Sequence, residues 1–239
     1  MPVDRRPPAR HKPKGVTILH EDKDIIVVEK PGGLLTIGTD RDKTRTVHTI
    51  LNEYVRKGDP RSRNRIYIVH RLDRETSGIL IFARSEAVKL NLQEQWQDTD
   101  KHYLAVVHGW LAAKAGTISS YLAENSAFTV YSTPDPTRGK LSHTEYVVLK
   151  EVKGYSMLEI HLLTGRKHQI RVHLSEIGNP VVGDRKYGQG NNAHDALALH
   201  ARSISFIHPV SNKRLAFETR IPDYFTRLVG RIEISSTTT

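Results

Sequence analysis

The chain of 239 residues contains no cysteine, which excludes whole classes of site. Without thiols there can be no disulfide, no iron–sulfur cluster, no cysteine-ligated zinc and no thiolate nucleophile. Apolar runs are short, and those such as 79–83 fall far below the roughly 20 residues that cross a bilayer. The first residues are rich in proline and arginine where a secretory signal needs an apolar stretch. We therefore expect a cytoplasmic protein in a reducing compartment.

Several familiar catalytic motifs are missing as well. The sequence has no Gly-x-Gly-x-x-Gly dinucleotide fingerprint, no P-loop and no Gly-x-Ser-x-Gly nucleophile elbow. His168 and His173 are five residues apart, which places them roughly 140° apart around a helix. His194 and His200 fall in different predicted elements, so neither pair has the spacing of a zinc-binding helix. Dinucleotide, P-loop and metal sites are therefore unsupported by the sequence.

Positive charge is what the chain has in excess. Lysine and arginine number 36 against 26 acidic residues, which gives a formal net charge of +10. This balance is typical of proteins that bind polyanions, nucleic acid first among them, although a merely soluble basic protein has the same composition. Hydrophobic residues make up 38% of the chain and support a folded domain.

Composition divides the chain into three predicted parts. Residues 1–14 are rich in proline and basic residues and are predicted to form a disordered tail. Residues 15–233 are predicted to form one globular domain, and residues 234–239 a flexible C-terminal tail. The basic tail at 1–14 could contact phosphates or simply be solvated.

Apolar periodicity predicts the secondary structure of the globular part. Helices are expected around 47–54, from Ser85 to about Gln97, and from about Lys167 to Ile177 with Gly178 as the C-cap. Long alternation of strand and helix is missing, so the pattern favours an α+β fold over a doubly wound parallel sheet. Strands are expected at 17–20, 25–29, 66–69, 79–83, 103–107, 143–150, 155–162, 203–207 and 215–219.

Two segments have the charged and polar residues expected of a functional site. The first is a dense turn around Asp73, which two apolar strands hold between them. The second places Arg171 beside the apolar helical stripe of Ile170 and Leu174, where a half-buried guanidinium needs a carboxylate partner. Taken separately, each has a plainer interpretation: a solvated turn capped by Asp73, and a basic surface helix.

Together these segments resemble the RluA-type family of RNA pseudouridine synthases. The resemblance runs from about Val16 to Asp223. Only a short tail precedes it, so the chain is similar to family members without an extra N-terminal RNA-binding domain. The matching motifs, in family order, are Lys30-Pro31-x-Gly33, His70-Arg71-Leu72-Asp73-x-x-Thr76-Ser77-Gly78, Lys101-x-Tyr103, Thr164-Gly165-Arg166-x-His168-Gln169-Ile170-Arg171-x-His173, Gly183-Asp184-x-x-Tyr187-Gly188 and Leu199-His200-Ala201.

The resemblance implies a fold and a reaction. The expected α+β fold is a mixed, largely antiparallel sheet flanked by helices, with a central active-site cleft. The expected activity is that of an isomerase, which converts uridine in RNA to pseudouridine and needs neither metal nor cofactor. The partner would be structured ribosomal RNA, transfer RNA or both, so the protein would serve rRNA or tRNA processing. We expect a monomer without membrane contact.

Site residues follow by position in the family motifs. Asp73 is expected to be the catalytic carboxylate, Arg171 its charge partner and Tyr103 the aromatic that packs on the target base. Arg71 is expected to fill the space that the flipped base leaves. Three further residues are expected to contact the substrate: His70, Arg166 and Gln169.

A basic loop precedes the strand that leads to Asp73. We predict that its arginines, Arg61, Arg63 and Arg65, contact the RNA backbone, although a solvated loop has the same sequence.

Two other functions compete with this interpretation. One is an RNA-binding protein on the same fold without activity, but binding alone would not need the carboxylate of Asp73. The other is a glycoside hydrolase using Asp73 and Glu75. Two carboxylates in one turn are poorly placed to flank a sugar from opposite sides.

Overall fold

The computed structural model describes residues 12–38, 45–57, 59, 61–188, 194 and 196–232. The chain forms two compact units. The first comprises the residues up to Lys101 together with Ala201–Thr219, and the second comprises His102–His200 with the residues from Arg220 onward. Each unit has its own strands and its own apolar core.

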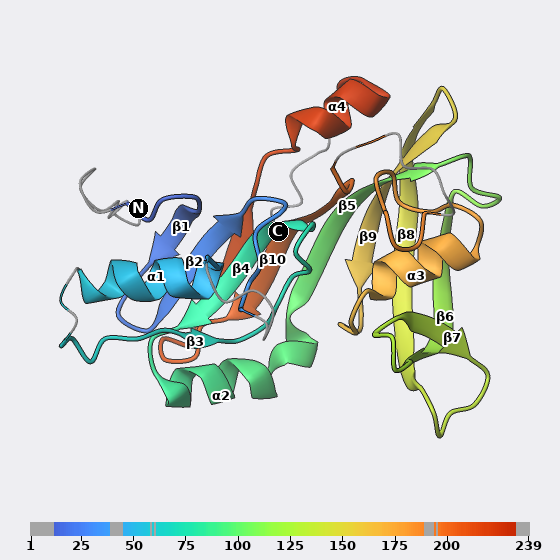
Figure 1. The fold of residues 1–239 in the computed structure, drawn as a ribbon. Coiled ribbons are helices and arrows are strands. Elements are labelled where there is room, and N and C mark those ends of the chain that lie inside the picture. Colours follow the sequence, from blue (N-terminus) through green and yellow to red (C-terminus); the bar gives the residue numbers. More distant parts are fainter. Residues whose placement is uncertain are drawn as a thin grey trace. The chain divides into compact units, whose positions relative to one another are not determined.

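Among the described residues, the first unit contains five whole strands and most of a sixth. They are β1 (Thr17–Glu21), β2 (Ile25–Lys30), β3 (Tyr67–Ile68), β4 (Ser77–Ala83), most of β10 (Leu199–Ile207) and β11 (Arg214–Glu218) (Figure 1). Their order is β1-β2-β4-β10, with β3 also paired to β4 and β11 to β10. The helices are α1 (Val47–Arg56), α2 (Glu86–Glu94) and the short 3-10 helix η2 (Trp96–Asp98).

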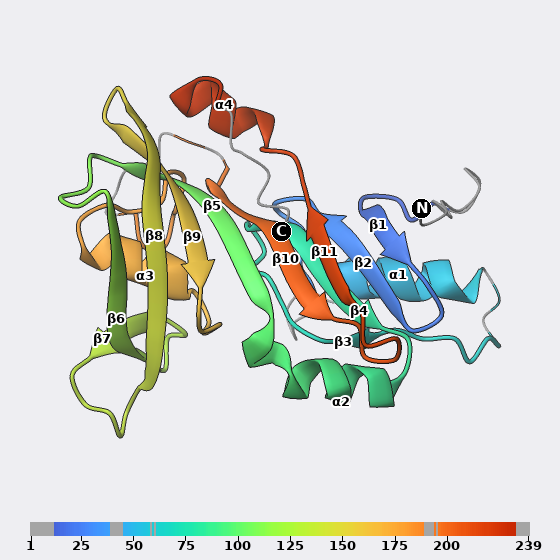
Figure 2. The same cartoon turned by 180° about the vertical axis from the view of Figure 1, so that it is seen from behind.

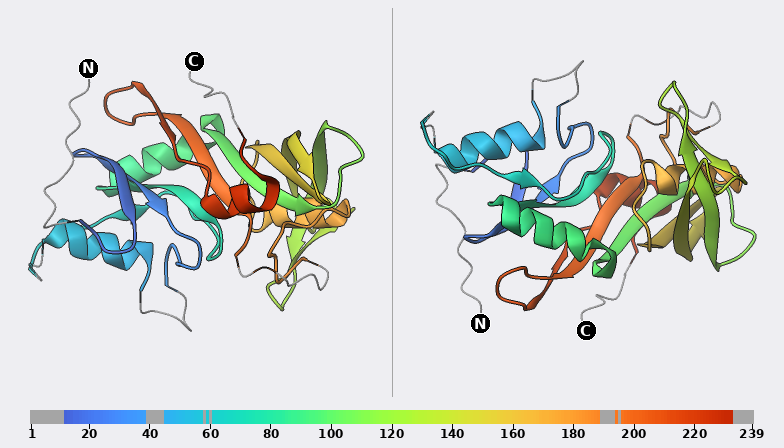
Figure 3. Two further views of the ribbon diagram at one scale, coloured as in Figure 1. Left: turned by 90° about the horizontal axis from the view of Figure 1, so that it is seen from above. Right: turned by 90° about the horizontal axis from the view of Figure 1, so that it is seen from below.

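Helices cover both faces of these strands. Val88 and Leu92 of α2 pack with Ile25 and other apolar residues of the strands. Alternate strand residues such as Ile26 are fully buried too, and α1 lies on the other side of the strands from α2 (Figure 3). Strands buried on both faces have continuous apolar sequences, which explains why β2 and β4 could be recognised from the sequence.

The second unit is built on five antiparallel strands in the order β5-β9-β8-β6-β7. The strands are β5 (Asp100–His108), β6 (Ala115–Glu124), β7 (Val130–Thr133), β8 (Lys140–Val152) and β9 (Tyr155–Leu162). Helix α3 (Gln169–Glu176) lies against one face of β6, β7 and β8 (Figure 1), and Figure 2 shows the opposite face of these strands. Helix α4 (Asp223–Val229) adds Phe225 and Val229 to the core.

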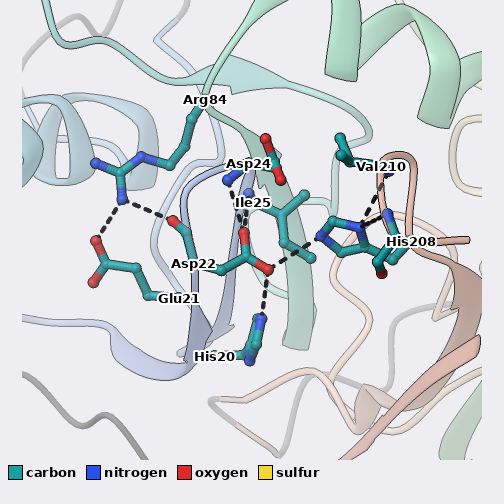
Figure 4. Close-up of polar contacts among 9 residues, drawn as sticks. His20, Glu21, Asp22, Asp24, Ile25, Arg84, His208 and Val210 are labelled. Carbon is teal, nitrogen blue, oxygen red and sulfur yellow. Dashed lines mark hydrogen bonds and ion pairs between the residues drawn. The ribbon is translucent and has the colours of Figure 1, made fainter. Parts of the chain in front are cut away.

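One carboxylate organises the turn between β1 and β2 (Figure 4). Oδ1 of Asp22 accepts hydrogen bonds from the backbone N–H groups of Asp24 and Ile25, each at 2.8 Å. Oδ2 lies 3.0 Å from Nε2 of His20 and 3.1 Å from Nε2 of His208. The residue at the β1–β2 turn thus holds the β10–β11 turn, 186 positions further along the chain.

The secondary-structure predictions succeed where periodicity is strong. Strand 155–162, the helix ending before Gly178 and the Ser85 N-cap, which accepts from Val88 N–H at 3.2 Å, are confirmed. The helix predicted to reach Gln97 is wrong at its end, because it stops at Glu94 and a 3-10 turn follows. Three elements were not predicted: β6, β7 and α4.

The predicted domain boundaries stay a prediction. The tail at 1–14 falls almost wholly outside the described residues, and the tail at 234–239 falls entirely outside them. The fold class is confirmed: the elements are those of an α+β protein with a largely antiparallel arrangement of strands.

Candidate active site

The backbone around Asp73 is fixed on both sides of that residue. Oγ1 of Thr36 donates to the carbonyl of Leu72 at 2.9 Å and accepts from its N–H at 3.2 Å. The N–H of Gly33 donates to the carbonyl of Arg74 at 2.9 Å. Asp73 itself is partly exposed. A carboxylate with both neighbours pinned is positioned before any substrate arrives.

A fully buried ammonium group lies beneath this turn. Nζ of Lys30 donates to the carbonyls of Pro31 at 2.9 Å, Leu34 at 2.7 Å and Arg74 at 2.9 Å. Burial lowers the pKa of Lys30 to about 8, while the negative charges of Glu75 and Asp73 act in the opposite direction. The motif Lys30-Pro31-x-Gly33 therefore both braces the turn and brings a positive charge near Asp73.

Gly78 lets β4 approach β10 immediately after the turn. Its φ is +116°, and a Cβ atom there would lie 2.2 Å from the carbonyl oxygen of Ala201. No side chain fits in that space. The backbone of Ala201, in the motif Leu199-His200-Ala201, thus explains the glycine of the Asp73 motif.

His70 anchors the turn at its start. Its Nε2 accepts a hydrogen bond from the N–H of Ile81 at 3.0 Å, and its ring packs on Trp96 at 4.4 Å between centroids. Burial, with the nearby charge of Lys101, lowers the pKa of His70 to about 3, so the ring is neutral. These contacts give His70 a role in holding the strand, and its predicted substrate contact stays a prediction.

Lys101 contacts Trp96, the residue on which His70 packs. Its Nζ donates to the carbonyls of Trp96 at 3.2 Å and of Thr99, and lies 5.6 Å from the centre of the Trp96 ring. Burial lowers its pKa. This explains the lysine of the motif Lys101-x-Tyr103 as a brace for η2. Tyr103, in the second unit, is partly exposed on β5 opposite Ile160 of β9 and packs on the core.

In the second unit Arg171 has the carboxylate partner that a buried guanidinium needs. Its Nε lies 2.7 Å from Oδ2 of Asp184, and its Nη2 lies 2.8 Å from Oδ1. The ring of Tyr187 lies 5.2 Å from the guanidinium carbon. Both Arg171 and Asp184 are buried. This two-point contact fixes the plane of the guanidinium.

Asp184 is itself held as an anion. Burial raises its pKa, but the hydrogen bonds and charge of Arg171, with the N–H groups of Tyr187 and Lys186, outweigh burial and lower it. Gly183 precedes it with a φ of +77°, and a Cβ there would lie 2.0 Å from the carbonyl oxygen of Ala196. The motif Gly183-Asp184-x-x-Tyr187 is therefore a cradle for Arg171.

Gln169 occupies the wall of this site. Its Oε1 accepts from Oγ1 of Thr164 at 2.8 Å and from the N–H of Arg166 at 3.0 Å. Its Nε2 donates to the carbonyl of His143 and to Oγ1 of Thr144. Direct contact with a substrate would break these bonds, so the structure supports a positioning role. Arg166, in contrast, is exposed.

The remaining predicted residues lie on the surface of the first unit. Arg71 is exposed, as are Arg61, Arg63 and Arg65. Arg65 also borders an open groove of about 500 Å³ beside α1, whose lining includes His48, Asn52 and Arg56. Asp73 belongs to the first unit, whereas Tyr103 and Arg171 belong to the second.

Sequence reasoning quoted Asp184, Tyr187 and Lys30 as motif residues but gave them no role. The signal was present for Asp184: Arg171 required a buried carboxylate, and Asp184 is the carboxylate in the motif that follows. For Lys30 no signal existed, because a lysine beside Pro31 and Gly32 is expected in a solvated turn.

One group of side chains in the first unit has the composition of a metal site. Asp22, Asp24 and His208 lie close enough to share an ion. However, Nδ1 of His208 accepts from the N–H groups of Val210 and Ser211 at 3.2 and 3.0 Å, so Nε2 carries the proton and donates to Asp22. This geometry is that of a hydrogen-bonded brace.

Among the described residues, no helix is long and apolar enough to cross a membrane.

Comparison with known proteins gives a consistent result. A model of the RNA pseudouridylate synthase family matches residues 24–176, more than half of the chain. An uncharacterized RNA pseudouridine synthase of Mycoplasma genitalium is 35% identical over 225 residues, covering 92% of this chain and 71% of the relative. Ribosomal large subunit pseudouridine synthase D of Zymomonas mobilis is 33% identical, covering 96% of this chain and 77% of the relative.

Two solved human structures share the fold. RNA pseudouridylate synthase domain containing 4 superposes with a TM-score of 0.73 at 23% identity, covering 88% of this chain and 90% of that one. RNA pseudouridylate synthase domain containing 1 superposes with a TM-score of 0.69 at 26% identity, covering 90% and 86%. The chain therefore belongs to the RNA pseudouridine synthase family, isomerases that convert uridine in RNA to pseudouridine.

Proposed function

We propose that Asp73 is the carboxylate with which this enzyme isomerises uridine in folded RNA. The main support for the proposal is that hydrogen bonds fix the turn on both sides of Asp73. Leu72 and Arg74 are hydrogen-bonded to the segment 33–36, and the ammonium group of Lys30 donates to the carbonyl of Arg74. A fixed anion suits a reaction that develops positive charge on a sugar.

The reaction is balanced without a co-reactant. The bond between N1 of uracil and C1′ of the ribose breaks, the base turns, and C5 bonds to C1′. C5 loses its proton and N1 gains one. Asp73 would either attack C1′ or remove a proton from the sugar, and both routes require it to be ionised.

Arg171 is proposed to keep Asp73 charged during the reaction. Asp184 and the ring of Tyr187 hold the guanidinium so that it cannot reorient freely. A cation immobilised in this way stabilises a second anion at little entropic cost. Tyr103 is proposed to pack on the target base, since a flat aromatic face tolerates the turning of the base.

Arg71 is proposed to enter the stack that the target nucleotide leaves. Extruding a base costs a few kcal/mol, and a guanidinium that fills the gap returns part of this energy. Arg71 is exposed and lies two positions before Asp73 in the sequence. It would therefore be close to the point where the target nucleotide leaves the RNA stack.

Ribosomal RNA is the proposed substrate class, because the relative from Zymomonas mobilis is named for the large ribosomal subunit. Transfer RNA is the alternative. Pseudouridine mapping in total RNA with and without the protein distinguishes the two. The cytoplasmic location and the monomeric state stay predictions.

Tritium release from RNA labelled at C5 of uridine tests the activity. Only substitution at C5 frees the label, so neither an inactive RNA-binding protein nor a glycoside hydrolase gives a signal.

The first prediction concerns Asp73→Asn, which keeps the shape of the side chain and removes its charge. Turnover should fall to background while RNA affinity and thermal stability stay near those of the wild type. Glu75→Gln, in the same turn, is the matched control and should retain activity. Turnover near the wild-type rate in Asp73→Asn would show that the carboxylate is not catalytic.

A further inference from the structure

An exposed aromatic residue stands at the turn between β6 and β7. The side chain of Phe128 is 68% exposed, and its backbone is left-handed with a φ of +57°. Asn125 builds the turn: its Oδ1 accepts from the N–H groups of Ala127 and Thr129, each at 3.0 Å. The N–H of Phe128 also donates to the carbonyl of Asn125 at 2.9 Å.

Neither the backbone nor the packing of the unit accounts for phenylalanine here. A left-handed conformation favours glycine or asparagine, and a bulky residue adopts it at a steric cost. A side chain this exposed gains little from burial to offset that cost. Strain of this kind that persists in an ordered turn points to a contact with something outside the chain.

Two lysines contact Phe128, one at its ring and one at its backbone carbonyl. Nζ of Lys167 lies 5.4 Å from the centre of the ring and is ion-paired with Glu124. Nζ of Lys186 donates to the carbonyl of Phe128 at 2.6 Å. The combination of a flat apolar face with adjacent cations fits a base and the phosphates on either side of it.

The turn is connected to the arginine cradle of the same unit. The N–H of Val130 donates to the hydroxyl of Tyr187 at 3.1 Å, and Nδ1 of His168 lies 2.8 Å from the same oxygen. The Tyr187 ring is the one that faces Arg171. These contacts through Tyr187 hold the turn of Phe128 at a fixed place relative to Arg171.

We propose that Phe128 is a stacking platform for an unpaired nucleobase of the RNA substrate, with Lys167 and Lys186 contacting the neighbouring phosphates. The inference rests on the proposed function, since it takes the substrate to be RNA. It adds a second base-recognition point, outside the target uridine, to the reaction site.

Phe128→Gly is the sharpest test, because it should separate RNA affinity from stability. Glycine relieves the left-handed strain, so the melting temperature should stay the same or rise. Affinity for a single-stranded or loop-containing RNA should fall about 5- to 150-fold, the range for loss of one stacked base. The dependence of affinity on salt should not change, because stacking releases no counterions.

The lysines should behave in the opposite way. Replacing Lys167 and Lys186 by glutamine should lower the slope of log affinity against log salt by about one unit per lost contact. Phe128→Tyr should restore affinity. In Phe128→Trp the new indole should be quenched when the RNA binds. Trp110→Ala removes another exposed aromatic, 67% exposed, and is the matched control with unchanged affinity.

The outcomes separate the stacking inference from the proposed function. If the wild type releases no tritium but Phe128→Gly binds RNA more weakly at an unchanged salt slope, the proposed function fails and the platform stands. If the wild type is active and Phe128→Gly binds RNA as tightly as the wild type, the platform is overturned. An equal loss in Trp110→Ala, or a changed salt slope in Phe128→Gly, also overturns it.

Discussion

At the scale of single residues, buried charges explain three of the family motifs in this chain. Lys30, Arg171 and Asp184 are each buried, and each makes several hydrogen bonds to fixed partners. A buried charge is tolerated only when it is paired or well hydrogen-bonded, so each of these residues constrains its surroundings. Substitutions at these positions should therefore affect stability and turnover together.

Asp184→Asn tests the cradle of Arg171. The variant replaces the anion that contacts the buried guanidinium at two points, which should lower the free energy of unfolding by about 3 kcal/mol. Turnover should fall more than RNA affinity, because Arg171 loses its fixed orientation. Urea denaturation and tritium release measure the two effects.

Asp223→Asn, at an exposed carboxylate in the same unit, is the matched control and should alter the unfolding free energy by less than about 0.5 kcal/mol. An equally small change in Asp184→Asn would show that the pair with Arg171 is unimportant.

The buried Lys30 should make the free energy of unfolding depend on pH in the alkaline range. Its pKa is about 8 in the folded protein and 10.5 in an unfolded chain, so between these values the unfolded chain binds more protons. Stability from this group therefore rises with pH across the window, by at most about 3 kcal/mol at about 1.4 kcal/mol per pH unit. Unfolding free energies measured at pH 7 and pH 10 should show this rise in the wild type and not in Lys30→Met.

Because every other ionisable group is the same in both proteins, the difference between them isolates Lys30. Parallel pH profiles would mean that the lysine keeps its ordinary pKa.

At the scale of elements, hydrogen bonds made in turns connect segments that are distant in the sequence. The Asp22 carboxylate connects the β1–β2 turn to the β10–β11 turn. Burial alone would raise the pKa of Asp22, but the hydrogen bonds from His20, Ile25 and Asp24 hold it well below the ordinary value. Its stabilising effect is thus present above the unfolded pKa and is lost as the pH falls.

Asp22→Asn should destabilise the protein at pH 6 by about 2 kcal/mol, the value of hydrogen bonds to a charged acceptor. At pH 3 the gap to the wild type should be about 1 kcal/mol smaller, since the unfolded wild type is then mostly protonated at this residue. Denaturation at the two pH values measures the gap. A gap between Asp22→Asn and the wild type that is constant with pH would contradict the assignment.

Helices and strands were predictable from the sequence in two cases. Either one buried face gives a regular spacing of apolar residues, or both faces are buried and the sequence is continuously apolar. Val88 and Leu92 mark the buried side of α2, and β2 and β4 each contain a continuous apolar run, at 25–28 and 79–83. β6 was missed because its residues from Ala115 to Tyr121 are mostly exposed or half-buried and give no clear alternation. The α4 helix is short and depends on Phe225 and Val229 packing onto a core that only the folded chain forms.

The site was predictable only in part for the same reason. The motifs identified Asp73 and Arg171, but no spacing rule assigns Asp184 to Arg171 or places Nζ of Lys30 against three carbonyls. Those contacts depend on loops brought together by the fold. The structure gives His70 and Gln169 hydrogen-bond partners within the protein, and their predicted substrate contacts stay predictions.

At the scale of the whole molecule, positive charge is the dominant property, with a net charge of +10. The proposed RNA path over Arg61, Arg63 and Arg65 follows from their exposure and from the basic groove beside α1. Contacts of this kind bind the ground state and the transition state alike, so they affect affinity more than turnover.

Replacing the three arginines by glutamine should weaken RNA binding and lower the salt slope by roughly one unit per lost contact. Turnover at saturating RNA should change little. A variant with the same loss of charge elsewhere, at Lys213, Arg214 and Arg227, controls for net charge. If the two triple variants behave alike, the loop has no special role, and the RNA path moves to the surface of Arg166, Lys167 and Lys186.

The first unit is assembled from two distant stretches of chain, since Ala201–Thr219 joins residues that precede Lys101. During synthesis from the N-terminus, β4 and the Asp73 turn emerge long before the strand that fills the space beside Gly78. The proposed catalytic turn around Asp73 therefore acquires its final surroundings only after most of the protein has left the ribosome. A nascent chain is expected to be inactive until that late stage, so premature termination anywhere before β10 yields a product without a formed site.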